Sequence, residues 1–434
     1  MPTRAIVVHY HELWLKGRNR LFFLNRLADA LRRSLEGLPV ERIGRPGDRI
    51  LVWLGEGADT AEALRRIEHV LGVAYFAPVQ TVERDLDAIC AAAWEELKDE
   101  PFATFAVRAK RSDKSFPYRS SEIERTVGSY LLARLREAGR EARVNLGSPD
   151  RTCRVEITPG PVLVYARKIP GPGGLPAKTG GKMACLLSGG FDSAVAAYKL
   201  MKRGAHLVFV HFYGTGAQPG ESSMHVAREL TRQLTPYQLT ATLFLVPFEP
   251  IQREIVRYAP EESRVLLYRR MMLRIAAAFA ERTRALALVT GDSLGQVASQ
   301  TLENMIAVDR AVPLNVFRPL VGDDKQEILA IAKRIGTYDI SSEPFHDCCP
   351  VFLPRSPALR ATAEELERAE AGLDIPALVR QGVETATIER YRLVNGRVER
   401  IARKAQSSAL SAAPVPLPDS THESTAEPVP APKA

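Results

Sequence analysis

The sequence runs Cys185-Leu186-Leu187-Ser188-Gly189-Gly190-Phe191-Asp192-Ser193-Ala194 at the point that decides its fold. The short apolar run from Lys182 to Leu187 leads into this loop and has the pattern of a buried strand. The segment from Ala194 to Met201 follows the loop and has a helical pattern, and Lys202, Arg203 and Gly204 mark the end of this helix. A strand that enters a helix through a glycine-rich loop presents backbone N–H groups and the positive end of the helix dipole to an anion. The sequence therefore predicts a phosphate-binding loop between a buried strand and a helix.

The loop differs from the two most familiar phosphate-binding motifs. No Gly-Lys-Ser/Thr follows its glycines, so it is not a Walker A loop, and it does not match G-x-G-x-x-G. Asp192 admits two roles, a partner for Mg²⁺ beside the phosphates or a cap for the helix. An ordinary strand–turn–helix capped by a serine or by Asp192 is the alternative interpretation of the same residues.

Length, composition and charge describe a basic globular protein of several domains. The 434 residues suffice for two or three hydrophobic cores, and 45% hydrophobic with 25% charged residues is typical of globular proteins. The net charge of +8 suits a polyanionic partner, although solubility alone accounts for it equally well. Five cysteines in so long a chain favour a reducing compartment, so we expect a cytoplasmic protein. No apolar run is long enough for a membrane span, so we expect no membrane partner.

Shifts in composition divide this α/β chain into four parts. The parts are residues 1–57, 58–170, 171–400 and 401–434. The first contains a strand at 6–8, a helix at 20–35 and a strand at 50–54, which predicts a small ferredoxin-like domain. The second is a further α/β domain, and a Gly/Pro-rich linker separates it from the third. The last part is rich in Ala, Ser and Pro, which predicts a disordered tail.

The third part alternates strands and helices in the order of a doubly wound parallel sheet. The predicted strands are residues 182–187, 206–212, 240–246 and 285–290, and the predicted helices are 194–203, 223–234, 251–257, 264–281 and 325–335. Ligands of such sheets bind beyond the carboxyl ends of the strands. We therefore expect the loop at Ser188 to Ser193, the pair His211-Phe212 and the run Gly291-Asp292-Ser293 to share one edge.

Two basic segments predict contacts with nucleic acid. The segment from Tyr10 to Arg20 mixes aromatic residues with Lys16 and Arg18, which suits base stacking and phosphate contact. A second segment runs between a strand at 105–108 and a helix at 121–137, for which Ser121 and Glu124 predict a capping box. Its cations are Arg108, Lys110, Arg111, Lys114 and Arg119. The alternatives are a loop packed on a neighbouring domain for the first segment and a solvated charged loop for the second.

Cations for the nucleotide phosphates are expected on two helices. Arg269 carries a permanent charge, and Arg270 is the next choice. Neighbouring residues on a helix point about 100° apart, so both arginines are not expected to reach one phosphate. Lys325 is a second cation candidate, with a surface lysine in the first turn of a helix as the alternative.

The cysteines separate into two groups. Cys348 and Cys349 stand on an irregular, proline-containing stretch, where a thiol is exposed enough to react. Cys90 falls on a helix face and Cys153 and Cys185 fall in strands, which favours core positions for all three. His346 with the two neighbouring cysteines supplies too few ligands at poor spacing, so no metal site is predicted.

Several stretches together resemble a known enzyme family. They are Ser188-Gly189-Gly190-Phe191-Asp192-Ser193, Arg269-Arg270-Met271-Met272, Val289 to Leu302 (VTGDSLGQVASQTL), Arg318-Pro319-Leu320, Asp324-Lys325 and Asp347-Cys348-Cys349-Pro350. In this order they resemble the tRNA 4-thiouridine synthase family, also called the tRNA sulfurtransferases of thiamine biosynthesis. The resemblance implies an N-terminal ferredoxin-like domain, a THUMP RNA-binding domain and a PP-loop ATP pyrophosphatase domain.

The family resemblance implies a reaction and its participants. ATP adenylates O4 of a tRNA uridine, position 8 in the family, and a cysteine persulfide then supplies the sulfur of 4-thiouridine. Asp192, Cys348 and Cys349 are the expected catalytic residues, with Cys348 at the position of the family's persulfide cysteine. The expected nucleotide contacts are Leu186, Leu187, Ser188, Gly189, Gly190, Ser193, His211, Phe212, Arg269, Gly291, Gln300 and Lys325. ATP and Mg²⁺ are the implied cofactors, and the partners are tRNA, a cysteine desulfurase, the thiazole sulfur-carrier protein and a second copy in a homodimer.

The sequence departs from part of the family in one respect. Some members carry a C-terminal rhodanese domain with a cysteine, but residues from Ala361 onward contain no cysteine, so we expect the form without that domain. The desulfurase then delivers sulfur directly to Cys348 or Cys349, or the neighbouring thiol resolves the persulfide. Two other functions stay open. The chain acts mainly on the thiazole sulfur carrier, or it is an RNA-binding protein whose nucleotide site only gates binding.

Overall fold

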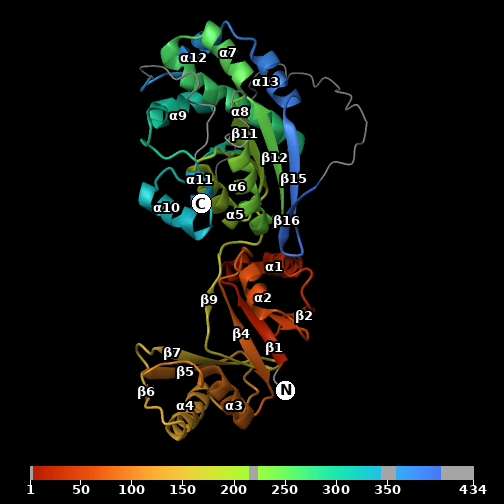
Figure 1. The fold of residues 1–434 in the computed structure, drawn as a ribbon, viewed down its shortest axis with the longest axis vertical. Coiled ribbons are helices and arrows are strands. Elements are labelled where there is room, and N and C mark those ends of the chain that lie inside the picture. The colour runs from red at the N-terminus through yellow and green to blue at the C-terminus, as the bar shows by residue number, and fades with distance from the viewer. Residues whose placement is uncertain (1–2, 215–222, 344–357, 402–434) are drawn as a thin grey trace, which may run out of the picture. The chain divides into compact units, whose positions relative to one another are not determined.

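The computed structural model describes residues 3–214, 223–343 and 358–401 (Figure 1). Within these ranges the chain forms two separate β-sheets, each with its own helices. Cys348 and Cys349 lie outside the described residues. The predicted disordered tail also lies outside them, except for its first residue, Ile401. The predicted α/β class is confirmed.

The first sheet has nine strands in the order β2-β3-β1-β4-β8-β7-β5-β6, with β9 paired to β4. Its strands are β1 (Thr3–His9), β2 (Val40–Gly44), β3 (Ile50–Leu54), β4 (Tyr75–Val82), β5 (Thr104–Arg111), β6 (Arg143–Val144), β7 (Arg151–Ile157), β8 (Val162–Tyr165) and β9 (Ile169–Pro170). Its helices are the 3-10 helix η1 (Glu12–Asn19), α1 (Arg20–Ser34), α2 (Thr60–Ile67), α3 (Leu86–Leu97) and α4 (Ser120–Glu137). The sheet is continuous because β4 pairs with β1 along one edge and with β8 along the other.

The helix α2 shares a hydrophobic core with α1. Leu27 and Leu31 of α1 and Leu64 and Ile67 of α2 belong to one buried cluster, together with the inner face of β1. The shift in composition at residue 58 predicts that α2 belongs to the second part of the chain. The apolar face of α2 instead packs with the elements of the first part, because the alternating residues of β1 offer it the nearest buried surface.

Two local predictions in the second part are corrected. The strand predicted to end at Arg108 continues to Arg111, because β5 pairs in parallel with β7 over its last residues. The capping box predicted at Ser121 and Glu124 lies two residues earlier, since Arg119 is the N-cap and Glu122 accepts a hydrogen bond from its backbone N–H at 2.6 Å. Glu124 is free for another role and accepts from the backbone N–H of Ala109 at 2.9 Å.

The second sheet follows the order β14-β13-β10-β11-β12-β15-β16. Its strands are β10 (Lys182–Leu186), β11 (His206–Tyr213), β12 (Thr240–Pro247), β13 (Leu288–Val289), β14 (Val316–Phe317), β15 (Thr387–Val394) and β16 (Arg397–Ile401). The five strands from β14 to β12 are parallel, as predicted, whereas β15 and β16 add an antiparallel edge. The strand predicted at 285–290 is shorter, because only Leu288 and Val289 pair with β10 through Ala184 and Cys185.

Helices cover both faces of this sheet (Figure 1). They are α5 (Phe191–Lys202), α6 (Ser223–Gln238), α7 (Glu249–Tyr258), α8 (Arg264–Thr283), α9 (Leu302–Asp309), α10 (Lys325–Arg334), α11 (Tyr338–Ser342), α12 (Ala363–Glu370) and α13 (Ile375–Glu384), with short 3-10 turns η2 (Glu261–Ser263) and η3 (Ala298–Gln300). Val208 and Val210 of β11 pack under α7 and α8, whereas Leu207 and Phe209 pack under α5 and α6. This alternation makes the sheet a rigid support for the loops at its carboxyl edge.

Candidate nucleotide-binding site

The glycine-rich loop joins β10 to α5 and is held closed by its two serines. The Ser188 backbone N–H donates to the Ser193 hydroxyl at 3.0 Å, and that hydroxyl donates to the Gly190 carbonyl at 3.0 Å. The two hydroxyls of Ser188 and Ser193 lie 3.1 Å apart. Gly190 is the N-cap of α5 and has no side-chain capping bond, so the alternative of Asp192 or a serine as the N-cap is wrong. Asp192 instead lies in the first helical turn, where the helix dipole favours an anion.

Two neighbouring strand ends close around this loop. His211 of β11 is buried, and its Nδ1 lies 2.8 Å from the Leu187 carbonyl while its Nε2 lies 3.0 Å from the Ser223 hydroxyl. Gly291 follows β13 directly opposite the start of α5. A Cβ at position 291 would lie 2.6 Å from the Ser193 nitrogen, so only glycine fits against this backbone. The parallel register thus brings three sequence segments to one edge, as predicted.

A cavity of about 240 Å³ opens at this edge. Its lining residues are Leu186, Leu187, Ser188, Asp192, Ser193, Val210, His211, Phe212, Arg269, Met272, Leu273, Thr290, Gly291, Asp292, Gln300, Val308 and Arg318. Nine of the twelve predicted nucleotide contacts are among them, together with Asp192. Gly189 and Gly190 are not in the lining, and Lys325 reaches the site only through Asp192.

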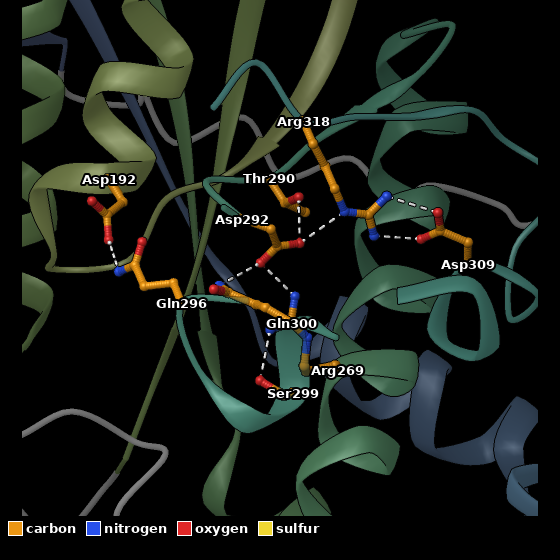
Figure 2. Close-up of polar contacts among 9 residues, drawn as sticks. All are labelled: Asp192, Arg269, Thr290, Asp292, Gln296, Ser299, Gln300, Asp309 and Arg318. Carbon is orange, nitrogen blue, oxygen red and sulfur yellow. Dashed lines mark hydrogen bonds and ion pairs between the residues drawn. The ribbon is translucent and has the colours of Figure 1, made fainter. Parts of the chain in front are cut away.

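The carboxylate of Asp192 has two polar neighbours, Lys325 and Gln296, of which Figure 2 shows Gln296. Gln296 donates to Oδ2 at 3.1 Å, and the Lys325 ammonium lies 3.3 Å from each carboxylate oxygen. The same ammonium lies 4.2 Å from the centre of the Phe191 ring. Within the residues that the structure describes, no group of three or more His, Cys, Asp or Glu side chains lies close enough to hold a metal ion. A Mg²⁺ ion at Asp192 therefore fits only with phosphate and water oxygens as its other ligands.

Asp292 is the centre of a hydrogen-bonded cluster in the cavity wall (Figure 2). Its Oδ1 accepts from Arg269 at 2.5 Å and from Gln300 at 3.1 Å, and its Oδ2 accepts from Thr290 at 2.8 Å and from Arg318 at 3.1 Å. Burial raises the pKa of this carboxyl, but Arg269, Arg318 and Thr290 outweigh burial and hold the pKa at about 2. The group is therefore a buried, ionised carboxylate between two arginines.

The motifs predict no role at the site for Thr290 and Arg318, and they place Asp292 at the shared sheet edge without a role of its own. Asp292 directly follows the predicted contact Gly291, and Arg318 stands in one of the family-like stretches, so a weak signal was present. Arg269 and Arg270 diverge as expected from helical geometry. Arg269 faces the cavity, whereas Arg270 is buried on the other side of α8 and binds Glu370 and the Ala307 carbonyl.

The predicted RNA-binding cations lie on η1, β5 and the loop after β5. Arg18 is exposed on η1, and the Lys16 ammonium lies 5.0 Å from the centre of the Phe23 ring. The exposed cations of the second segment are Arg108, Lys110, Lys114 and Arg119. Arg111 is half-buried and donates to the carbonyls of Lys114 and Phe116, so it holds the loop in shape. The exposed Arg108 donates to the carbonyl of Leu146. Contact with RNA stays a prediction for all of these residues.

The buried thiols are inert, as expected for core cysteines. Cys90, Cys153 and Cys185 are all buried and free. Burial raises the pKa of Cys90 to about 11 and the pKa of Cys153 and Cys185 to about 12. A thiol with so high a pKa carries almost no thiolate at neutral pH, so none of the three is a nucleophile.

Three models of known protein families match successive parts of the chain. Residues 5–77 match the ThiI ferredoxin-like domain, residues 83–167 match the THUMP domain, and residues 178–375 match the thiamine biosynthesis protein (ThiI). A probable tRNA sulfurtransferase of Thermus thermophilus is 46% identical over 379 residues, which are 87% of this chain and 92% of the relative. The chain belongs to the tRNA sulfurtransferase family.

A second tRNA sulfurtransferase and one solved structure support this family membership. The probable tRNA sulfurtransferase of Moorella thermoacetica is 42% identical over 88% of this chain and 97% of its own length. The crystal structure of a 4-thiouridine synthetase–RNA complex with bound ATP is 32% identical, with a TM-score of 0.81 over 89% of this chain and 99% of that one. Among the described helices of this tRNA sulfurtransferase family member, none is both long and apolar enough to span a membrane.

Proposed function

We propose that this chain transfers sulfur to a tRNA uridine, position 8 by family resemblance, and forms 4-thiouridine at the expense of ATP. The observation that carries the proposal is the cavity where the Ser188–Ser193 loop, Arg269 and the ends of β10, β11 and β13 converge. The solved relative with the same fold is described as holding RNA and ATP together, which supports the same two ligands here.

The cavity residues suit the cleavage of ATP between its α and β phosphates. Uridine O4 attacks the α-phosphorus, a new O4–P bond forms, and the P–O bond to the departing pyrophosphate breaks. The Ser188 hydroxyl and the loop N–H groups bind the departing pyrophosphate, where charge develops in the transition state. Arg269 lines the cavity and adds a permanent positive charge. The apolar residues Leu273 and Val308 provide a surface for the adenine ring.

Asp192 is the residue proposed to hold Mg²⁺. The ion would take one carboxylate from the protein and its remaining ligands from phosphates and water, which is the usual pattern for magnesium at nucleotides. Mg²⁺ supplies charge neutralisation for the phosphates. Lys325, 3.3 Å from Asp192, partly balances the charge of that carboxylate before the ion binds.

Cys348 and Cys349 are proposed as the sulfur-carrying thiols, and both lie outside the described residues. The three other cysteines are buried with raised pKa values, which supports this choice. The terminal sulfur of the persulfide attacks C4 of the adenylated uridine, the C4–O4 bond breaks, and AMP leaves with O4. A second thiol then attacks the remaining S–S bond and ends in a disulfide, which releases the sulfur on the uridine. Cys349 is a choice for that thiol, although adjacent cysteines close only a strained ring.

The partners follow from this chemistry. A cysteine desulfurase in the cytoplasm supplies the persulfide sulfur, and the first sheet with its exposed cations binds the tRNA. A homodimer is proposed from the family resemblance alone. Sulfur transfer to the adenylated C-terminus of the thiazole sulfur carrier is a second activity, which the family description of a thiamine biosynthesis protein favours.

The test is reconstitution with purified protein, ATP, Mg²⁺, tRNA, a cysteine desulfurase and cysteine. We expect 4-thiouridine in the digested tRNA and a mass increase of about 32 Da, one sulfur atom, on Cys348 or Cys349. Cys348→Ser abolishes thiolation, whereas Cys185→Ser, which changes a buried thiol, retains it. Absence of 4-thiouridine in the complete reaction contradicts the proposal, and absence of product with retained tRNA binding favours a protein that only binds RNA. Unchanged thiolation by Cys348→Ser would assign the persulfide to Cys349 instead.

A further inference from the structure

The four hydrogen bonds of Asp292 occupy the whole acceptor capacity of its carboxylate. Each oxygen has about two lone-pair sites, and each accepts from two donors, Arg269 and Gln300 on Oδ1 and Thr290 and Arg318 on Oδ2 (Figure 2). The residue is 5% exposed, so water does not compete for these positions. Although Asp292 lies in the cavity wall, its carboxylate oxygens have no lone pair left to bind a substrate or a metal ion.

Arg269, by contrast, keeps donors available for a ligand. Its Nη2 donates to Asp292 and its Nη1 donates to the Ser299 hydroxyl at 3.1 Å. A guanidinium carries five N–H groups, so the others remain for an anion in the cavity. The two anchors hold the planar group by one edge, and a side chain anchored in this way loses little entropy when it binds a phosphate.

Arg318 binds the other carboxylate oxygen of Asp292. It donates through Nε to Asp292 and through both terminal nitrogens to Asp309, at 2.7 and 2.6 Å. Two carboxylates thus surround this arginine, and its charge is balanced within the protein. Arg318 braces the carboxylate, whereas Arg269 is the cation directed to the ligand.

The geometry points to Asp292 as a positioning residue, which acts on the nucleotide only by fixing the guanidinium of Arg269 at the phosphate end of the cavity. This inference rests on the proposed ATP-dependent function and adds a residue with an indirect role to it. It predicts that a change at Asp292 matters only while Arg269 is present.

A double-mutant cycle tests this dependence. The probe is the ATP analogue with a methylene group between the α and β phosphorus atoms, which the enzyme cannot cleave, and its dissociation constant is measured by calorimetry with the full chain. Loss of one charge-assisted hydrogen bond corresponds to roughly tenfold or more in affinity, so Asp292→Asn and Arg269→Met are each expected to weaken binding by at least that factor. In the Arg269→Met background, Asp292→Asn is expected to change affinity by less than about twofold.

Two further variants test whether the position of the Asp292 carboxylate matters, separately from its charge and from a failure to fold. Glu254→Gln removes a carboxylate from Arg257 on α7, an exposed pair outside the cavity, so analogue binding is expected to stay within about twofold of wild type. Asp292→Glu keeps the charge but displaces it by one methylene, and a tenfold loss of affinity is still expected because Arg269 moves with it. Asp292→Glu also carries the test if Asp292→Asn does not fold, as judged by circular dichroism.

The outcomes are distinct. Non-additive losses in the cycle, with weak binding by Asp292→Glu, support the inference. Wild-type affinity in Asp292→Asn, or losses that multiply in the double variant, overturn it while the proposed function stands. If the wild-type chain itself does not bind the analogue, the proposed ATP-dependent function fails, and the inference that rests on it fails as well.

Discussion

Gly291 shows how one missing side chain shapes the site. The chain after β13 passes the first turn of α5 so closely that a Cβ at Gly291 would lie 2.6 Å from the nitrogen and 2.8 Å from the Cα of Ser193. Both are backbone atoms, so no side-chain rotation relieves the clash. The close approach brings the Asp292 cluster and the glycine-rich loop into one cavity wall.

Gly291→Ala is therefore expected to displace the loop that carries Ser193. Overpacking of this kind costs about 1–3 kcal/mol of unfolding free energy, and affinity for the uncleavable ATP analogue should fall by about tenfold or more. Calorimetry and thermal unfolding measure the two effects. Gly322→Ala is the matched control, since a Cβ there meets nothing within 4 Å. Equal affinities of Gly291→Ala and the wild type for the ATP analogue would show that the close contact between Gly291 and the Ser193 backbone is not needed for binding.

At the scale of elements, a buried ionic cluster joins strands of the first sheet. Glu156 of β7 accepts from the Tyr165 hydroxyl of β8 at 2.6 Å and pairs with Arg49 at 2.9 Å and with His9 of β1 at 3.2 Å. Burial raises the pKa of Glu156, but hydrogen bonding and charge from His9, together with Arg49, lower it to about 2. The Arg49 side chain is fully buried, so Glu156 is its necessary counterion.

Glu156→Gln is expected to lower the unfolding free energy by about 3–5 kcal/mol at neutral pH, because it leaves Arg49 buried without a counterion. The folded pKa lies below the ordinary value of 4.5, so the ionised group stabilises the fold fully above pH 4.5. That contribution is lost as the pH falls from 4.5 towards 2. The difference between wild type and variant should be constant above pH 5 and shrink in that acid range, as measured by denaturant titrations.

Glu100→Gln is the control for this prediction. Glu100 pairs with Arg151 at 3.0 Å, and both side chains are about half exposed. Such a surface pair contributes about 0–1 kcal/mol, so the variant should unfold almost as the wild type does. A Glu156→Gln variant with the same small effect at neutral pH would contradict the role assigned to the cluster.

At the scale of the whole molecule, the net charge of +8 favours association with RNA. Lys110 on β5 and Lys114 in the following loop are both exposed, and neither side chain holds the loop as Arg111 does. We predict that both lysines contact tRNA phosphates and add to tRNA affinity, without an effect on the cavity in the second sheet.

Replacing Lys110 and Lys114 together by glutamine is expected to weaken tRNA binding and to lower the slope of log K against log salt by about two. Affinity for the ATP analogue should stay unchanged, because the cavity lies in the second sheet. Arg253→Gln with Arg257→Gln on α7 removes the same charge and should leave the slope unchanged. The salt slope is obtained from tRNA binding measured between about 50 and 200 mM salt. If the Arg253 and Arg257 changes lowered the salt slope as much as the Lys110 and Lys114 changes, only the total charge of the protein would matter for tRNA binding.

The sequence by itself determined the features that depend on local pattern. The glycine-rich loop, the alternation of strands and helices and the burial of Cys153 and Cys185 follow from hydrophobic periodicity and turn residues, which act over a few neighbouring positions. The parallel order also predicted that Ser188, His211 and Gly291 would share one edge, because the carboxyl ends of parallel strands lie together.

Only the tertiary structure decided which polar side chains meet at that edge. Asp292 and Arg318 are 26 residues apart, and their contact depends on the pairing of β13 with β14. The antiparallel addition of β15 and the packing of α2 with α1 are likewise long-range events. Local pattern cannot specify them, because each depends on which buried surfaces and charges remain unpaired once the sheets have formed.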